Sequence, residues 1–291
     1  MKFTTGRAAL TAAVAVSALM TGTGVAPSTA AAAASTAAPG PSAAPVRYVA
    51  LGDSVAAGVG AGAPNANADS CFRADGTRIP NSTRAYPRLV ATALGARLEF
   101  RAFCGANTKA VINEQLGALN RRTKLVTVQV GANDFGFTGV VKKCILFSGG
   151  SICNNAIAEV QRAFLKELPG RLDKVYTAIR IKAPNARVLV VGYPKLVRQQ
   201  GSGCYADGLM GLGTRQKLNA AAHTLNDVTA IAAQRKGIEF VAAENPFKGH
   251  AICEDPEWIN GISYPDTVES FHPNASGHRA FSWLIWQKVK P

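Results

Sequence analysis

The chain has 291 residues, 47% of them hydrophobic, with 28 Gly, 15 Pro and 6 Cys. This is enough apolar material to bury one sizeable core, which excludes a disordered or purely fibrous protein. Charged residues are 17% of the chain, below the roughly 25% usual in soluble domains, and 32 Lys and Arg against 18 Asp and Glu give a formal net charge of +14, which favours anionic surfaces without indicating a function.

The first residues have the pattern of a secretory signal peptide. Lys2 and Arg7 precede an apolar run, residues 8–20, and small residues then continue to an A-x-A-like cleavage pattern at Ala30. A membrane anchor needs about 20 apolar residues, so this run is too short to span a bilayer. We therefore predict a signal peptide over residues 1–30 and a secreted, extracellular protein without a transmembrane segment.

The next segment is expected to be a flexible Ala/Pro/Ser linker. Residues 31–45 (AAAASTAAPGPSAAP) carry no charge and no large side chain, so they have nothing to bury. The folded domain is predicted to cover residues 46–291. Removal of the signal peptide leaves 30 basic against 18 acidic residues, a formal charge of +12, so the basic character belongs to the domain.

Short apolar runs rich in β-branched residues alternate with helical patterns along this domain. The expected strands are residues 47–51, 98–103, 125–130, 188–191 and 238–241. The expected helices are residues 86–94, 109–119, 155–168, 171–182, 214–236 and 275–289. Strands buried on both faces and separated by crossover helices predict a three-layer α/β/α sandwich around a central parallel five-stranded sheet. In such sheets, sites lie beyond the carboxyl ends of the strands.

Four candidate site residues occur at or near these strand ends. The tripeptide GDS ends the first strand and contains Ser54, Gly105 follows the second strand, and Asn133 follows the third. His272 comes shortly before the last helix. Histidine is the usual base for activating a serine hydroxyl, and backbone N–H and amide groups can stabilise a developing oxyanion. Together, the four residues could therefore supply a nucleophile, a base and oxyanion donors at one edge of the sheet.

In this order the motifs resemble the four blocks of the SGNH hydrolases, also called GDSL esterases and lipases, and the chain looks closest to secreted actinomycete lipases with three disulfides. The resemblance spans residues 47–290 and implies a flavodoxin-like fold. It implies that Ser54 is the nucleophile and that His272 is the base. The N–H groups of Ser54 and Gly105 and the side-chain amide of Asn133 would form the oxyanion hole.

The sequence departs from the family pattern in two places. The usual GDSL reads Gly-Asp-Ser-Val here, and Glu269 stands three residues before His272, where the family usually has Asp. We expect the Glu269 carboxylate to orient the imidazole as a third catalytic residue. A backbone carbonyl, which holds the histidine in some relatives, is the alternative.

The implied reaction is hydrolysis of a carboxylic ester through an acyl-enzyme on Ser54. It needs no cofactor and no metal. The expected partners are an ester or lipid substrate and, transiently, a lipid interface, with no nucleic acid, and we expect a monomer. An imidazole with its ordinary pKa of about 6.5 predicts activity that rises from acidic to neutral pH. Phospholipase A activity on anionic lipid surfaces is one alternative, and a secreted binding module without catalysis is another.

All six cysteines follow the predicted signal peptide, and in an oxidising environment an even number favours disulfides, although the sequence allows many connectivities. Pairing in sequence order, which we favour, gives three bonds: Cys71–Cys104, Cys144–Cys153 and Cys204–Cys253. The middle pair brackets a Gly-Gly loop that can close easily. A zinc site is disfavoured, because no Cys-x-x-Cys occurs and His250 has only Cys253 near it in the sequence.

Two competing motifs are weaker. Residues 58–63 (GVGAGA) satisfy the dinucleotide-binding pattern G-x-G-x-x-A, but these glycines do not directly follow the strand. The G-x-S-x-G elbow of α/β-hydrolases needs a glycine where Ala56 stands. The remaining histidines, His223, His250 and His278, have no motif around them and are expected to lie outside the catalytic site.

Overall fold

The structure is a computed structural model that describes residues 45–62, 71–72, 78–79, 81–146, 150–201, 203–263 and 267–290. Internal contacts group residues 44–291 into one unit. The predicted signal peptide and all but the last residue of the predicted linker lie outside the described residues, so both stay predictions.

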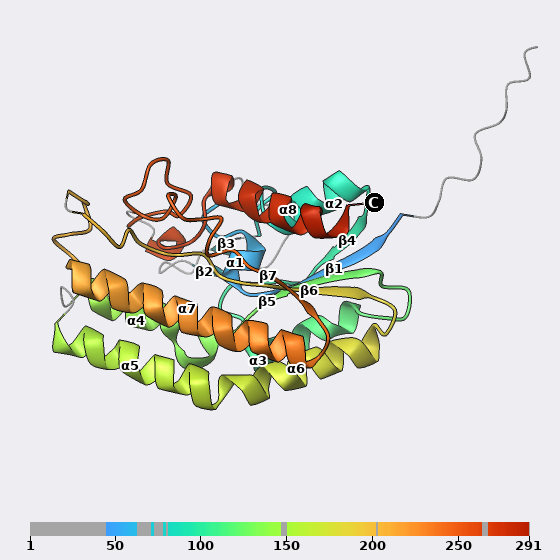
Figure 1. The fold of residues 1–291 in the computed structure, drawn as a ribbon. Coiled ribbons are helices and arrows are strands. Elements are labelled where there is room, and N and C mark those ends of the chain that lie inside the picture. Colours follow the sequence, from blue (N-terminus) through green and yellow to red (C-terminus); the bar gives the residue numbers. More distant parts are fainter. Residues whose placement is uncertain are drawn as a thin grey trace, which may run out of the picture. The chain divides into compact units, whose positions relative to one another are not determined.

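A parallel five-stranded sheet forms the centre of this unit, in the order β4-β1-β5-β6-β7 (Figure 1). Its strands are β1 (Arg47–Gly52), β4 (Arg97–Phe100), β5 (Leu125–Gln129), β6 (Arg187–Val191) and β7 (Glu239–Val241). All five residues of β5 are buried, which explains why it reads as a continuous apolar run rather than an alternating one. A separate antiparallel pair consists of β2 (Cys71–Phe72) and β3 (Arg78–Ile79).

Helices cover both faces of the sheet. They are α1 (Ser54–Ala57), α2 (Tyr86–Leu94), α3 (Thr108–Ala110), α4 (Phe137–Leu146), α5 (Ser151–Lys166), α6 (Leu168–Lys182), α7 (Leu212–Arg235) and α8 (Ala275–Val289). Figure 1 shows α2 and α8 packed on one face and α3 to α7 on the other. The predicted α/β/α sandwich is thus confirmed. Of the helices in the described part of the chain, none is long and apolar enough to cross a membrane.

The strand order creates a crevice at the carboxyl ends of the strands. Counted along the chain, the five strands have the order 2-1-3-4-5 of flavodoxin-like sheets. The chain leaves β1 for β4 on one side and later returns to β5 on the other side. The connections after β1 and β5 therefore diverge, and the space between them is the usual place for a site in this type of sheet.

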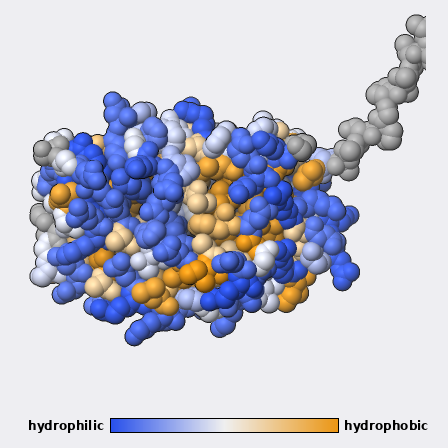
Figure 2. All heavy atoms as spheres, in the orientation of Figure 1, coloured by the Kyte–Doolittle hydropathy of each residue, from blue (hydrophilic) through white to orange (hydrophobic). Residues whose placement is uncertain are grey.

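The β7 edge of the sheet is short. In the view of Figure 2, polar side chains cover most of the surface, and an apolar strip crosses it between α7 and α8, where Figure 1 shows β7. Phe240 of this strand is partly buried and packs against the core. With only three residues, β7 offers little length for pairing with another chain.

Two parts of the chain differ from the sequence prediction. The region predicted as one helix, residues 109–119, consists of α3, a π-helical turn (Val111–Gln115) and a 3₁₀ turn (Leu116–Ala118). In the π-helical turn, the Gln115 side chain bonds the backbone of Gly52, which is distant in the sequence. Helix α4 was not predicted, because its ten residues include Gly139 and give only a short apolar pattern.

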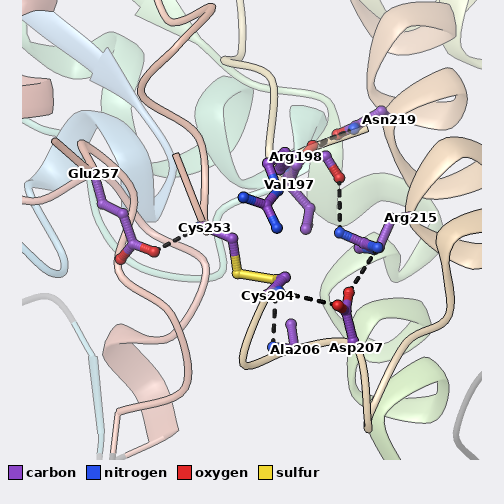
Figure 3. Close-up of a disulfide and its surroundings, with 9 residues drawn as sticks. All are labelled: Val197, Arg198, Cys204, Ala206, Asp207, Arg215, Asn219, Cys253 and Glu257. Carbon is purple, nitrogen blue, oxygen red and sulfur yellow. Dashed lines mark hydrogen bonds and ion pairs between the residues drawn. A yellow bond between two sulfur atoms is a disulfide. The ribbon is translucent and has the colours of Figure 1, made fainter. Parts of the chain in front are cut away.

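Two disulfides join described residues, and both follow the expected pairing. Cys144–Cys153 links the last turn of α4 to the first turn of α5, with the Cα atoms 4.6 Å apart. Cys204–Cys253 links the loop after β6 to the loop before His272 (Figure 3). The side chain of Cys71 lies outside the described part, so the Cys71–Cys104 bond stays a prediction.

An ion pair with a buried arginine supports the second disulfide (Figure 3). Arg215 is only 2% exposed, and its guanidinium lies 2.7 Å from Asp207 Oδ1 and donates to Arg198 O at 3.2 Å. The other carboxylate oxygen, Asp207 Oδ2, accepts from Cys204 N at 2.9 Å. Without Asp207 the buried guanidinium of Arg215 would carry an uncompensated charge, so this contact fixes the loop that carries Cys204.

Removing the Cys204–Cys253 bond is expected to destabilise the fold more than removing the Cys144–Cys153 bond. The two bonds close sequence separations of 49 and 9 residues. In the chain-entropy model these correspond to about 4 and about 2.5 kcal/mol. Denaturant unfolding of the two double Cys→Ala variants measures the difference. An equal loss in both would contradict the assignment of this stabilisation to loop closure.

Candidate active site

The turn that follows β1 places Ser54 at the carboxyl edge of the sheet. Gly52 has φ +142°, and a Cβ added to it would lie 2.4 Å from Gln129 O, so only glycine fits there. The side chain of Gln115 bonds both backbone groups of Gly52, at 2.7 and 2.9 Å. Asp53 then caps α1 by accepting from Val55 N at 3.0 Å. Ser54 therefore begins α1 directly at the end of β1.

The His272 ring contacts Ser54 with one nitrogen and a backbone carbonyl with the other. Nε2 lies 2.8 Å from Ser54 Oγ, and Nδ1 lies 3.1 Å from Ser270 O. A carbonyl only accepts hydrogen bonds, so in the neutral ring Nδ1 carries the proton and Nε2 is the acceptor for the serine hydroxyl. This is the geometry that a base needs to remove a proton from a serine.

The loop that carries His272 is held by Asn260. The N–H of Asn260 donates to His272 O at 2.9 Å, and its side chain donates to Gly60 O at 2.9 Å. A Cβ on Gly60 would lie 2.6 Å from Asn260 Nδ2 and 3.0 Å from His272 Cβ. The glycine-rich stretch that resembled a dinucleotide motif is thus explained by close packing against the histidine loop.

The expectation that the Glu269 carboxylate orients His272 is wrong in this structure. The ring bonds Ser270 O instead, and between Glu269 and His272, both described residues, the contact is a backbone one, from His272 N to Glu269 O at 3.2 Å. A 3₁₀ turn (Thr267–Glu269) precedes the histidine and reverses the chain. This turn brings the carbonyl of Ser270, two residues before His272, to Nδ1.

Glu269→Gln is therefore expected to change kcat by less than about 3-fold. Removing the acid of a serine triad can lower turnover by about 10⁴-fold, because the wrong tautomer then faces the serine. The Ser270 carbonyl is part of the backbone and survives this substitution. Steady-state kinetics of the variant and the parent protein measure the effect. A loss of 100-fold or more would restore the carboxylate to the site.

Two further donors face the same cavity as Ser54 and His272. Gly105 has φ +77° and lines the cavity together with Asn133. One N–H of the Asn133 amide donates to Ala106 O at 3.1 Å, and the second can donate to a ligand. Of the sequence-predicted site residues, Ser54, Gly105, Asn133 and His272 are brought together, and Glu269 is not.

Residues that were not predicted from the sequence hold together the loops that carry Gly105 and Asn133. Asp134 Oδ2 accepts from Thr108 N at 3.0 Å, and Oδ1 accepts from the Thr108 hydroxyl at 2.5 Å. Arg171 of α6 pairs with the same carboxylate at 3.3 Å, which balances its charge. The only signal in the sequence is that Asp134 directly follows Asn133, in the segment Gly-Ala-Asn-Asp of residues 131–134.

The cavity is large and mostly apolar. Its volume is about 530 Å³. Its walls come from α4, α7, the loop after β6 and the histidine loop, and they include Phe137, Val141, Ile145, Leu196 and Leu225. Such a space next to the serine can bind a long hydrocarbon chain.

Burial shifts two titratable groups beside Ser54. Burial lowers the pKa of His272 to about 4, although the Ser270 carbonyl acts in the opposite direction. Burial also raises the pKa of Asp53 to about 7, against hydrogen bonds from Tyr193 and Val55. A histidine with a low pKa stays neutral at neutral pH, which is the form that accepts a proton.

The other histidines lie outside this cavity. His278 is fully buried and accepts from Tyr86 N at 3.2 Å, while His223 and His250 bond Glu244 and Pro256 near the surface. Among the residues with described positions, no group of three or more His, Cys, Asp or Glu side chains could hold a metal ion.

Comparison with known proteins places the chain in a family. Residues 50–280 match the GDSL-like Lipase/Acylhydrolase family. The chain is 40% identical over 231 residues to a lipase from Streptomyces rimosus, covering 79% of this chain and 81% of that protein. It is 39% identical over 233 residues to Lipase 1 from Streptomyces coelicolor, with the same two coverages.

Solved structures agree with this assignment. Phospholipase A1 from Streptomyces albidoflavus NA297 has a TM-score of 0.78 at 35% identity, covering 84% of this chain and 100% of that chain. The extracellular lipase from Streptomyces rimosus has a TM-score of 0.76 at 36% identity, covering 83% and 99%. With the site geometry and these likenesses together, the chain belongs to the GDSL-like lipase/acylhydrolase family and is a carboxylic-ester hydrolase.

Proposed function

We propose that the protein is a secreted lipase or esterase in which Ser54 is the nucleophile and His272 the general base. The observation that carries this proposal is the 2.8 Å contact between His272 Nε2 and Ser54 Oγ inside the apolar cavity. A base must lie within hydrogen-bond reach of the proton that it removes, and this distance satisfies that requirement.

The reaction then runs in two halves. His272 takes the proton of Ser54 as Oγ attacks the ester carbonyl, and the imidazolium returns that proton to the departing alcohol. Water, activated by the same imidazole, next attacks the acyl-enzyme and releases the acid. The Ser270 carbonyl accepts from Nδ1–H throughout and so stabilises the imidazolium.

The negative charge of each tetrahedral intermediate is assigned to three donors. These are the N–H groups of Ser54 and Gly105 and the side-chain amide of Asn133. Removing one such donor typically costs about 3 to 4 kcal/mol of transition-state stabilisation. No cofactor takes part in any step of this scheme.

The substrate proposed is an ester of a long-chain fatty acid. The cavity walls are formed by aliphatic and aromatic side chains of α4 and α7, such as Val141 and Leu225, which match an acyl chain and not a sugar. A phospholipid is the second candidate, because one solved relative is a phospholipase A1.

A substrate panel tests this proposal. We expect p-nitrophenyl esters with acyl chains of eight or more carbons to have a kcat/KM at least about 10-fold above the acetate, because each buried CH₂ is worth about 0.8 kcal/mol. Triglyceride emulsions and phospholipid vesicles, with the released fatty acid quantified, distinguish a lipase from a phospholipase. Preference for the acetate would contradict the long-chain assignment, and no hydrolysis of any ester would contradict the function.

We also propose that the protein is exported and acts as a monomer. Residues 1–30 would direct export and be removed, residues 31–45 would form a linker, and the protein would act as a monomer in transient contact with lipid surfaces.

Cys71 and Cys104 would form a third disulfide. Thiol titration of the unfolded, unreduced protein is then expected to find no free thiol, and two reactive thiols would rule this bond out.

The acidic limb of the activity profile is expected near pH 4. The pKa of His272 is lowered to about 4, so the ring stays neutral above that pH and activity is lost only as the pH falls through it. An exposed imidazole would instead make activity rise with pH around a pKa of about 6.5. The measurement is kcat/KM for a p-nitrophenyl ester between pH 3 and 8, quenched in alkali for reading. A limb near 6.5 would contradict the effect of burial.

A further inference from the structure

One buried hydroxyl contacts the residues that precede both Ser54 and Asn133. Tyr193 follows β6, and its hydroxyl donates to Asp53 Oδ2 at 2.5 Å. The same oxygen accepts from Ala132 N at 3.4 Å. Since Asp53 precedes Ser54 and Ala132 precedes Asn133, the phenol bridges the turns after β1 and β5.

We propose that Tyr193 is a positioning residue that fixes the spacing between Ser54 and the Asn133 amide. This inference rests on the proposed function, in which Asn133 stabilises the oxyanion formed by attack of Ser54. The hydroxyl does not touch the reacting atoms. It acts through Asp53 and Ala132.

The backbone of Tyr193 is rigidly anchored, so its ring can serve as a fixed reference. The side chain of Asn226 on α7 accepts from Tyr193 N at 2.7 Å and donates to Tyr193 O at 2.9 Å. The preceding residue, Gly192, donates to Val241 O at 3.0 Å and accepts from the Gln129 side chain at 2.8 Å. The tyrosine is thus tied to the sheet and to α7.

The Asp53 carboxyl depends on this hydroxyl. It is 1% exposed, and within the described ranges no Lys or Arg forms an ion pair with it. Its hydrogen bonds come from the phenol on Oδ2 and from N–H groups of α1, with Val55 N on Oδ1. Loss of the phenol would remove the side-chain donor of this buried carboxyl, which would then be held only by the N–H groups of α1.

Such a loosening should lower kcat rather than raise KM. The oxyanion donors act on charge that exists only in the transition state, and small misplacements of reacting groups can lower rates by about 100-fold. Binding of the acyl chain depends on the apolar walls, which keep their contacts when one hydroxyl is removed.

The test compares Tyr193→Phe with Tyr48→Phe. Tyr48 is also fully buried and loses one hydroxyl hydrogen bond, to Thr127 Oγ1 at 2.7 Å, but it does not line the cavity. We expect Tyr193→Phe to lower kcat and the rate of fluorophosphonate labelling by about 10- to 100-fold, with KM changed by less than about 2-fold. Tyr48→Phe should leave kcat unchanged. Because each variant loses one buried hydroxyl hydrogen bond, we expect both to lower Tm by a similar amount.

A double-mutant cycle separates positioning from stability. If Tyr193 acts through Asp53, then Tyr193→Phe combined with Asp53→Asn loses no more activity than the worse single variant. Additive losses, or a Tyr193→Phe variant with kcat within 2-fold of the parent, would overturn the proposal. Should Tyr193→Phe fail to fold, Asp53→Asn alone must show the same loss confined to kcat. An active Ser54→Ala would instead overturn the proposed function, so the two failures are distinguishable.

Discussion

Replacing Ser54 by Ala is expected to lower kcat for ester hydrolysis by about 10⁴- to 10⁶-fold. Oγ is the atom that would carry the acyl group, and no other hydroxyl lies 2.8 Å from His272 Nε2 among the described residues. Only the smaller acceleration due to the oxyanion donors would remain. The variant should also lose covalent labelling by a fluorophosphonate, which mass spectrometry locates on the peptide containing Ser54.

The fold should survive this substitution. The backbone of Ser54 keeps its place in α1, because Val59 N bonds Ser54 O at 3.1 Å regardless of the side chain. Circular dichroism and Tm check this point. Ser276→Ala, a change in the first turn of α8 at a residue that does not line the cavity, is the matched control and should retain full activity. A folded Ser54→Ala protein with more than a tenth of the parent activity would refute the assignment.

Replacing His272 by Ala is expected to cause a loss of the same order. Without the imidazole, Ser54 Oγ has no base, and the departing alcohol has no acid. Because the two residues act as a unit, the variant that lacks both should be no less active than either single variant. Measured kcat values of the three variants test this non-additivity.

His223→Ala is the matched control for this change. His223 lies on α7 and is exposed, and its ring bonds Glu244 at 2.9 Å, away from the cavity. The His223→Ala variant should retain the kcat of the parent protein. If His272→Ala instead kept substantial activity and its fluorophosphonate labelling stayed fast, another group would have to accept the serine proton.

The sheet was predictable because its central strands carry strong local signals. Strands β5 and β6 are runs of buried β-branched and aliphatic residues, so they stand out from the amphipathic helices. Helices α2 and α8 begin and end where the sequence predicts, since Gly95 ends one and Asn274 caps the other. In contrast, the helix predicted over residues 109–119 is interrupted, and a distant backbone bond to Gln115 is invisible to local patterns.

The candidate site was predictable only where single side chains carry the chemistry. Ser54 and His272 belong to motifs that can be read directly. The group that orients the histidine is a backbone carbonyl at Ser270, and a carbonyl leaves no mark in the sequence. Tyr193 was missed for another reason. Its contact with Asp53 arises because β6 lies two strands away from β1 in the sheet, and that order was not known from the sequence.

The Ser54–His272 contact has a consequence for biosynthesis. Its two residues are 218 positions apart, one at the end of the first strand and the other just before the last helix. Contacts of such long range form only after the intervening chain has collapsed, because loop closure must precede them. A chain that has not yet folded would therefore lack the assembled Ser54–His272 pair and should not hydrolyse esters. Hydrolysis would begin only once the loop that carries His272 has reached the end of β1.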